Sequence, residues 1–230
     1  MKDRTIRFLA ALGASLMVLL GAVPALGHPH AWIDITSALR FDAEGRVTAI
    51  VEEWLFDPLY SAFVTDGIDQ DADTLQKELG ALARTNLDNL REYDYFTDVR
   101  LGGKRVAVGE VERFETAMHD GRLWMRFTVP LAAPADVRSE WLGYAIYDPT
   151  YFVEMLHIKG FEIALTPPDG IACETELTPP SPSAETRRFA FALDRTEEAP
   201  DSLGVHFAEW VTVKCEQAGA PPRSSPRWSC

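Results

Sequence analysis

The sequence has little positive charge and no basic stripe, and this shortage excludes two kinds of partner. Its 230 residues contain 22 Lys and Arg against 35 Asp and Glu, which gives a formal net charge of -13. An acidic surface repels phosphates and cannot drive counterion release, so we expect no nucleic acid as a partner. An anionic membrane surface is disfavoured for the same reason. The apolar share of 47% is ordinary for a globular chain and excludes wholesale disorder.

Several catalytic and redox motifs are also missing. The chain has no Cys-x-x-Cys, no Gly-x-Ser-x-Gly, no glycine-rich phosphate loop and no His-Glu-x-x-His. Without them, the sequence carries no signal for a thiol redox motif, a zinc knuckle or the common hydrolase and phosphate-binding sites. A serine triad stays open, because its members are distant from one another in the chain.

The first 27 residues have the features of a secretory signal peptide. Three basic residues within the first seven precede a 16-residue apolar segment, Phe8–Val23, which is shorter than a membrane-spanning helix requires. Small residues allow cleavage after Ala25 or after Gly27. We therefore expect a periplasmic protein that is not embedded in the membrane after cleavage, with an uncleaved anchor as the alternative.

The three cysteines allow one disulfide and one leftover thiol, and an oxidising compartment permits such a bridge. Of the three pairings we expect Cys173 with Cys215, because each lies in or beside a strand-like segment. Cys230 instead ends a Pro- and Ser-rich tail, residues 218–230, which we expect to be flexible.

Residues 28–217 are predicted to form a single β-rich domain. Apolar and polar residues alternate from His30 to Glu53, with turn residues at 42–45, which predicts a β-hairpin. The spacing of the apolar residues then becomes that of a helix, which predicts helices over about 58–65 and 74–92. Further strands are predicted at 96–101, 106–117, 122–131, 141–147, 151–157, 161–165, 172–177, 188–192 and 205–215, with a loop at 179–187. We expect a mainly β (α+β) fold, an antiparallel β-sandwich with a helical insertion after the first hairpin.

The strongest candidate for chemistry is His28-Pro29-His30. After cleavage behind Gly27, an α-amine and two imidazoles would lie within three residues, and such nitrogens bind Zn, Ni, Co and Cu well. Pro29 has no amide proton, so the square-planar peptide chelate is excluded if His28 is the first residue. The alternative is a pair of exposed polar residues on a frayed terminus.

Carboxylates would have to complete a metal site there, because two histidines alone rarely hold an ion tightly. The pattern aromatic-Asp-Pro-x-Tyr occurs at 56–60 and again at 147–151. We therefore predict His28, His30, Asp57 and Asp148 as the ligands. The alternative is that Asp-Pro simply starts a turn or a helix in both places. Three mid-strand acids, Asp34, Glu52 and Glu53, are expected to face water.

Other acidic and histidine residues carry weaker signals. An EF-hand loop begun at Asp69 would have Thr74 in place of its glycine and Gly80 in place of its last acid. An acidic turn before a helix, with Asp73 as the cap, is the better interpretation. We expect the remaining histidines to occupy a hairpin tip (His119) or strands (His157 and His206).

Four segments together resemble a bacterial periplasmic family, domain of unknown function 1007. They are His28–Asp34, Trp54–Ser61, Asn86–Leu90 with Tyr95-Phe96, and Tyr147–Tyr151, and the likeness covers most of residues 28–177. Members are commonly described as periplasmic components of an uncharacterised ABC-type transport system. The resemblance implies association with an inner-membrane permease for nickel, cobalt or zinc.

The expected function is therefore a periplasmic accessory protein that binds a divalent transition metal ion and passes it to or from a permease. A metal-dependent enzyme is the first alternative, for example a copper oxidase with an N-terminal histidine brace or a metal hydrolase. A structural adaptor of a transporter, in which the histidines are incidental, is the second.

Overall fold

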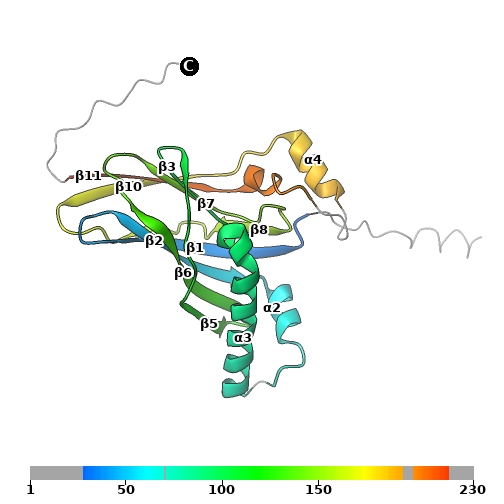
Figure 1. The fold of residues 1–230 in the computed structure, drawn as a ribbon. Coiled ribbons are helices and arrows are strands. Elements are labelled where there is room, and N and C mark those ends of the chain that lie inside the picture. Colours follow the sequence, from blue (N-terminus) through cyan, green and yellow to red (C-terminus); the bar gives the residue numbers. More distant parts are fainter. Residues whose placement is uncertain (1–27, 70, 194–198, 218–230) are drawn as a thin grey trace, which may run out of the picture.

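The computed structural model describes residues 28–69, 71–193 and 199–217 (Figure 1). The expected signal peptide, the expected flexible tail and Cys230 lie outside the described residues. No helix within the described ranges is long and apolar enough to cross a membrane.

Two β-sheets form the body of the protein, and the mainly β fold is as predicted (Figure 1). The first sheet has the order β5-β6-β2-β1-β8, with β9 also paired to β1, and the second has the order β10-β11-β7-β3-β4. The strands of the first sheet are β1 Ala31–Phe41, β2 Val47–Phe56, β5 Phe114–His119, β6 Arg122–Ala135, β8 Val153–His157 and β9 Ala164–Leu165. Those of the second are β3 Thr97–Leu101, β4 Lys104–Val106, β7 Leu142–Ile146, β10 Ile171–Thr178 and β11 Trp210–Gln217. Pairing is antiparallel except that β8 and β9 run parallel to β1.

Alternation along β1 and β2 determines which side chains enter the core. On β1, residues 31, 33, 35, 37 and 39 are buried, while 32 and 34 are exposed. Apolar side chains from both sheets share one core, which includes Ile35, Trp54, Leu142 and Val213. Two polar residues, Ser37 and Glu52, face each other across the β1–β2 ladder at inward positions, so this core contains buried polar groups.

The helical insertion after the first hairpin is present as α2 (Pro58–Thr65) and α3 (Ala72–Leu90), followed by a 3₁₀ segment, Arg91–Phe96. Asp57 caps α2, with Pro58 in its first turn. The cap of α3 is Asp71, which accepts a hydrogen bond from the Thr74 amide at 3.0 Å, and not Asp73 as predicted. Asp71 and Asp73 both precede the helical pattern of apolar residues. The pattern alone therefore could not show which of the two caps the helix.

Two predicted segments near the C-terminus are wrong. The predicted strand at 188–192 and the end of the predicted loop form instead a helix, α4 (Ala184–Ala192), which Ser183 caps through the Thr186 amide at 3.0 Å. Its Arg-Phe-Ala-Phe-Ala sequence alternates as a strand does, but the cap and only one buried residue fit a surface helix. His206 lies in a 3₁₀ turn, Gly204–Phe207, and β11 begins at Trp210.

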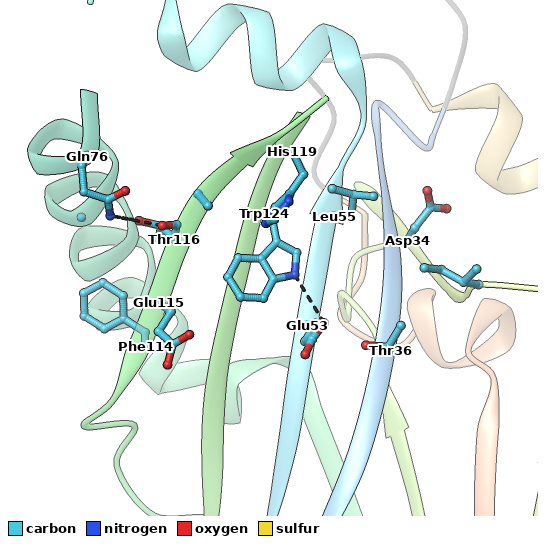
Figure 2. Close-up of a pocket in the computed structure, with 13 residues that line it drawn as sticks. Asp34, Thr36, Glu53, Leu55, Gln76, Phe114, Glu115, Thr116, His119 and Trp124 are labelled. Atoms are coloured by element: carbon cyan, nitrogen blue, oxygen red, sulfur yellow. Dashed lines mark hydrogen bonds between the residues drawn. The ribbon is translucent and has the colours of Figure 1, made fainter. Parts of the chain in front are cut away.

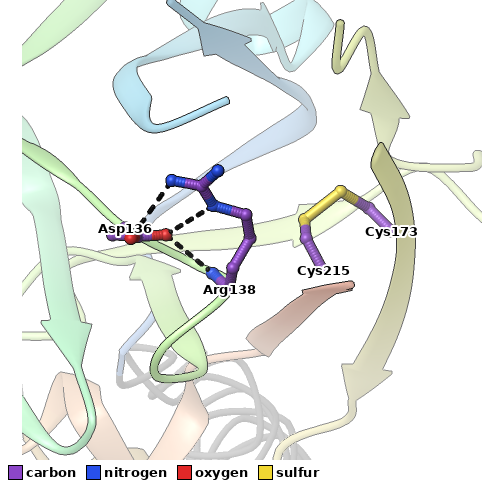
Figure 3. The surroundings of a disulfide bond; sticks show 4 residues. All are labelled: Asp136, Arg138, Cys173 and Cys215. Carbon is purple, nitrogen blue, oxygen red and sulfur yellow. Dashed lines mark hydrogen bonds and ion pairs between the residues drawn. A yellow bond between two sulfur atoms is a disulfide. The ribbon is translucent and has the colours of Figure 1, made fainter. Parts of the chain in front are cut away.

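The disulfide joins Cys173 and Cys215, as predicted (Figure 3). The two residues face each other on β10 and β11, and β10 is an edge strand of its sheet. The Cys215 amide donates to the Val137 carbonyl, so the segment that holds the Asp136–Arg138 ion pair packs beside the bridge. The disulfide therefore fastens an edge strand to the sheet.

Gly204 lies where two backbones approach each other closely. A Cβ atom there would lie 1.8 Å from the Asp148 carbonyl oxygen, and the Gly204 amide donates to the Pro149 carbonyl at 2.7 Å. We expect Gly204→Ala to lower the free energy of unfolding in urea by about 1–3 kcal/mol, the usual cost of overpacking. The control is Gly80→Ala on α3, where nothing lies within 4 Å. Equal stability of Gly204→Ala and the parent would contradict this close approach.

Candidate functional site

The two histidines of the predicted metal site lie together at the start of β1. Their ring centroids are 4.9 Å apart in an edge-on arrangement, and each ring also contacts Phe152. His28 is buried, whereas His30 is partly exposed. They are therefore not splayed into solvent, and the His28 Nδ1 and His30 Nε2 atoms are both buried.

Two backbone hydrogen bonds fix this terminus. The His30 amide donates to the Phe152 carbonyl at 2.8 Å, which starts the parallel pairing of β1 with β8. The His28 nitrogen donates to the Ala190 carbonyl at 3.1 Å, in the last turn of α4. These two bonds hold His28 against α4 and His30 against the start of β8.

Asp57 uses both carboxylate oxygens to hold the backbone. One accepts from the amides of Leu59 and Tyr60 at 2.8 and 2.9 Å, and the other accepts from the Trp32 amide at 3.1 Å. This carboxylate therefore starts α2 and fastens it to the first strand, two residues after His30.

Asp148 has a similar role in the loop between β7 and β8. One oxygen accepts from the amide and the hydroxyl of Thr150, each at 2.8 Å, and the other accepts from the Val153 amide at 3.0 Å. It is buried, and its loop delivers Phe152 to the two imidazoles. Both Asp-Pro motifs are thus caps that position the strand ends around the histidines.

Within the described residues, no group of three or more His, Cys, Asp and Glu side chains is placed to hold a metal ion. The histidine pair is thus the part of the predicted ligand set that the structure brings together. What it offers chemically is two imidazole rings, whose nitrogens suit divalent transition metal ions.

A second polar cluster lies between the sheets. Glu209 contacts the His157 ring at Nδ1 (2.9 Å), His157 Nε2 lies 2.9 Å from the Ser37 hydroxyl, and Ser37 lies 2.7 Å from the Tyr144 hydroxyl. With a proton on Nδ1, Tyr144 donates to Ser37 and Ser37 donates to His157, so every member is satisfied. The chain of contacts from Ser37 to His157 to Glu209 is the arrangement found in a Ser-His-acid catalytic triad.

Burial argues against catalysis by this cluster. Ser37 is 2% exposed and His157 is 6% exposed, so a substrate cannot reach the hydroxyl without opening the sandwich. Ser37 also shares its hydroxyl with Tyr144, whose pKa burial raises far above its ordinary value. We interpret the cluster as a satisfied polar network that ties β1, β7 and β8 together.

Glu52 is the third buried polar feature and is fully enclosed in the core. Its oxygens contact the Thr97 hydroxyl at 2.7 Å and the Trp54 indole nitrogen at 2.9 Å, while Thr97 also lies 3.1 Å from the Tyr95 carbonyl. Both groups donate to Glu52, the Thr97 hydroxyl to one oxygen and the Trp54 indole N–H to the other. These bonds favour the charged carboxylate, but burial outweighs them and raises the pKa of Glu52 to about 8.

A hollow of about 850 Å³ lies beside α3 on the outer face of the first sheet (Figure 2). Trp124 lies at its centre, between residues of β5 and β2, and its indole nitrogen is 3.4 Å from Glu53. Two of its three carboxylates already have arginine partners, Asp34 with Arg122 and Glu53 with Arg126. The hollow is therefore an open aromatic surface whose acids are largely neutralised.

Neither the Ser37 cluster nor the burial of Glu52 was predicted from the sequence, which placed Glu52 on a solvent face. The available signal was a polar residue at an inward position of an alternating strand, as at Ser37 and Glu52. Tyr144, which contacts Ser37, lies 107 residues further along the chain, and Glu209 lies 52 residues beyond His157, so neither had a local signal.

Comparison with known proteins agrees with the resemblance noted from the motifs. A protein of Spirochaeta aurantia, an uncharacterized 15.5 kDa protein in the trpE 3' region, is 40% identical over 94 residues, which are 41% of this chain and 66% of that protein. The chain thus spans slightly less than two thirds of that relative. An uncharacterized protein of Haemophilus influenzae is 25% identical over 193 residues, 83% of this chain and 92% of that protein. The family model described as protein of unknown function (DUF1007) matches residues 13–215, and the chain therefore belongs to that family.

Proposed function

We propose that the protein is a periplasmic accessory protein that binds a divalent transition metal ion, zinc, nickel or cobalt, as cargo for an inner-membrane permease. The observation that carries the proposal is the contact between the rings of His28 and His30 at the start of the exported chain. Imidazole nitrogens suit these ions.

A site with two imidazoles fits a carrier better than a storage or structural protein. Structural zinc sites use about four protein ligands, and fewer ligands leave positions for an acceptor to enter. His30 is the more exposed residue of the pair, although its Nε2 atom is buried, so an exchange partner would approach from its side. Binding is expected to weaken as pH falls, because protonated imidazoles cannot ligate.

The copper-oxidase alternative needs a neutral amine on His28 as a ligand. The His28 nitrogen already donates to the Ala190 carbonyl in the last turn of α4. The geometry therefore supports ligation through the rings more than a brace through the terminus.

The test is equilibrium dialysis against each ion, using protein secreted with its own leader. Intact mass first establishes whether the chain begins at Leu26 or His28. We expect the double variant His28→Ala, His30→Ala to lose affinity by more than about tenfold, that is, more than about 1.4 kcal/mol. The matched control is His119→Ala, His206→Ala, which removes two exposed imidazoles elsewhere. Equal affinity of the parent and the His28→Ala, His30→Ala protein would exclude this site.

A further inference from the structure

The hollow beside α3, on the outer face of the first sheet, has no part in the proposed metal binding. Its volume of about 850 Å³ lies within the range of about 300–1,000 Å³ that is usual for small-molecule sites. Neither member of the histidine pair lines it. A ligand bound there would therefore occupy a second site, and the side chains around the hollow indicate the chemistry of that ligand.

Strand register places a row of apolar side chains across the floor of the hollow. Ala117 on β5 lies opposite Trp124 on β6, and Trp124 lies opposite Leu55 on β2. Residues that face each other across a strand pair point to the same side of the sheet, so these three form one row. All three are partly exposed and line the hollow, with the Trp124 ring at its centre (Figure 2).

A polar row runs beside the apolar row, two residues away on each strand. Glu115 on β5 lies opposite Arg126 on β6, and Arg126 lies opposite Glu53 on β2. Glu53 in turn lies opposite Thr36 on β1. One margin of the apolar floor therefore consists of groups that form hydrogen bonds.

The opposite margin of the apolar row is polar as well. His119 lies opposite Arg122 on the β5–β6 pair, and the Arg122 guanidinium donates to Asp34 at 2.8 Å. The His119 ring meets the Trp124 ring edge-on, with 5.1 Å between their centroids. An aromatic floor thus lies between two polar margins.

The charges around the hollow favour a neutral ligand that donates hydrogen bonds. Ionised carboxylates accept hydrogen bonds and cannot donate them. Asp34 and Glu53 are already paired with arginines, and Glu115 lies opposite Arg126, so positive charge offsets these carboxylates. The hollow therefore offers acceptors without a large negative charge for a cation to neutralise, and hydroxyl groups are donors that suit it.

We infer that the hollow binds a neutral oligosaccharide, with a sugar ring stacked on Trp124. A sugar ring has an apolar C–H face and a rim of hydroxyl groups, which matches an apolar floor between two polar margins. The C–H face packs on the indole, whose π-face suits such a contact, and the hydroxyl groups donate to the carboxylates at the margins. Room for the ring is left by two small residues that line the hollow, Ala117 and Gly80, and a Cβ atom at Gly80 would have no other atom within 4 Å.

The experiment is isothermal titration calorimetry of the secreted protein with maltotriose, cellotriose and triacetylchitotriose, and with spermidine as a cationic probe. We expect at least one trisaccharide to bind and spermidine not to bind. Trp124→Ala should weaken the trisaccharide by at least about tenfold. Gly80→Leu, which adds a side chain at the margin of the hollow without touching its floor, should also weaken it. The matched control is Trp32→Ala, which removes an exposed indole outside the hollow and should bind as the parent does.

The remaining outcomes overturn the inference in different ways. If none of the three trisaccharides binds, the hollow is not a saccharide site, and the proposed metal binding is unaffected. If Trp124→Ala and Gly80→Leu bind a trisaccharide as tightly as the parent does, the sugar lies elsewhere. Binding of spermidine instead would assign the hollow to a cation. The double variant His28→Ala, His30→Ala should bind the trisaccharide as the parent does, and loss of binding there would contradict a separate site.

Discussion

The free energy of unfolding is expected to fall as pH rises from about 4.5 to about 8, because Glu52 is held protonated in the core. Its pKa is raised from 4.5 to about 8 by burial, so over this range the folded chain keeps a proton that the unfolded chain releases. Rising pH therefore favours the unfolded state until Glu52 also ionises in the fold. At about 1.4 kcal/mol per pKa unit, the full loss is on the order of 5 kcal/mol.

The measurement is urea denaturation at a series of pH values for the parent, Glu52→Gln and Glu53→Gln. The side-chain amide that Glu52→Gln introduces does not titrate. Its oxygen can accept from Trp54, and its nitrogen can donate to the Thr97 oxygen while the Thr97 hydroxyl donates to the Tyr95 carbonyl. This variant should therefore match the parent near pH 4.5 and exceed its stability above pH 8. Glu53 is the matched control, because it is the next residue on β2 but lies on the outer face. Parallel curves for the parent and Glu52→Gln would show that Glu52 is not the group responsible.

Loss of the disulfide should be the most damaging covalent change. Cys173 and Cys215 are 42 residues apart, and a closed loop of this length stabilises by about 4 kcal/mol in the chain-entropy model. The double variant Cys173→Ser, Cys215→Ser should therefore lose several kcal/mol in chemical denaturation under oxidising conditions. Because β10 is an edge strand, we expect its amides to lose hydrogen-exchange protection first.

Cys230→Ser is the control for this prediction, since it leaves the bridge in place and should denature as the parent does. A double cysteine variant as stable as the parent, with β10 still protected from exchange, would contradict the role of the bridge. A destabilised Cys230→Ser protein would mean that the third cysteine also forms a bond.

Much of the fold follows from local pattern. Alternation over residues 30–53 predicted β1 and β2, since one face of each strand is buried, and Asp57-Pro58 predicted the start of α2. The pattern failed at residues 188–192, where alternating Phe and Ala lie on a surface helix whose cap decides the structure. Whether two strands pair in parallel depends on chain topology, so no local pattern predicted that β8 lies parallel to β1.

Less of the candidate site than of the fold could be predicted from the sequence. His28 and His30 are neighbours in the chain, and their contact followed from that closeness. Asp57 and Asp148 were predicted as ligands from a repeated motif, but their oxygens hold backbone amides around the strand ends. The exposure of Leu59 and Phe63 could not be predicted, because it depends on which face of α2 packs inward.

The central claim is that His28 and His30 together bind the metal ion, and the most direct test observes every imidazole at once. The measurement is a long-range ¹H–¹⁵N correlation spectrum of the secreted protein during titration with zinc. The chain has 5 histidines. We predict that the ring nitrogens of His28 and His30 shift together and saturate, while those of His119, His157 and His206 stay in place. Shifts confined to the other histidines, or no shift at any ring, would contradict the account.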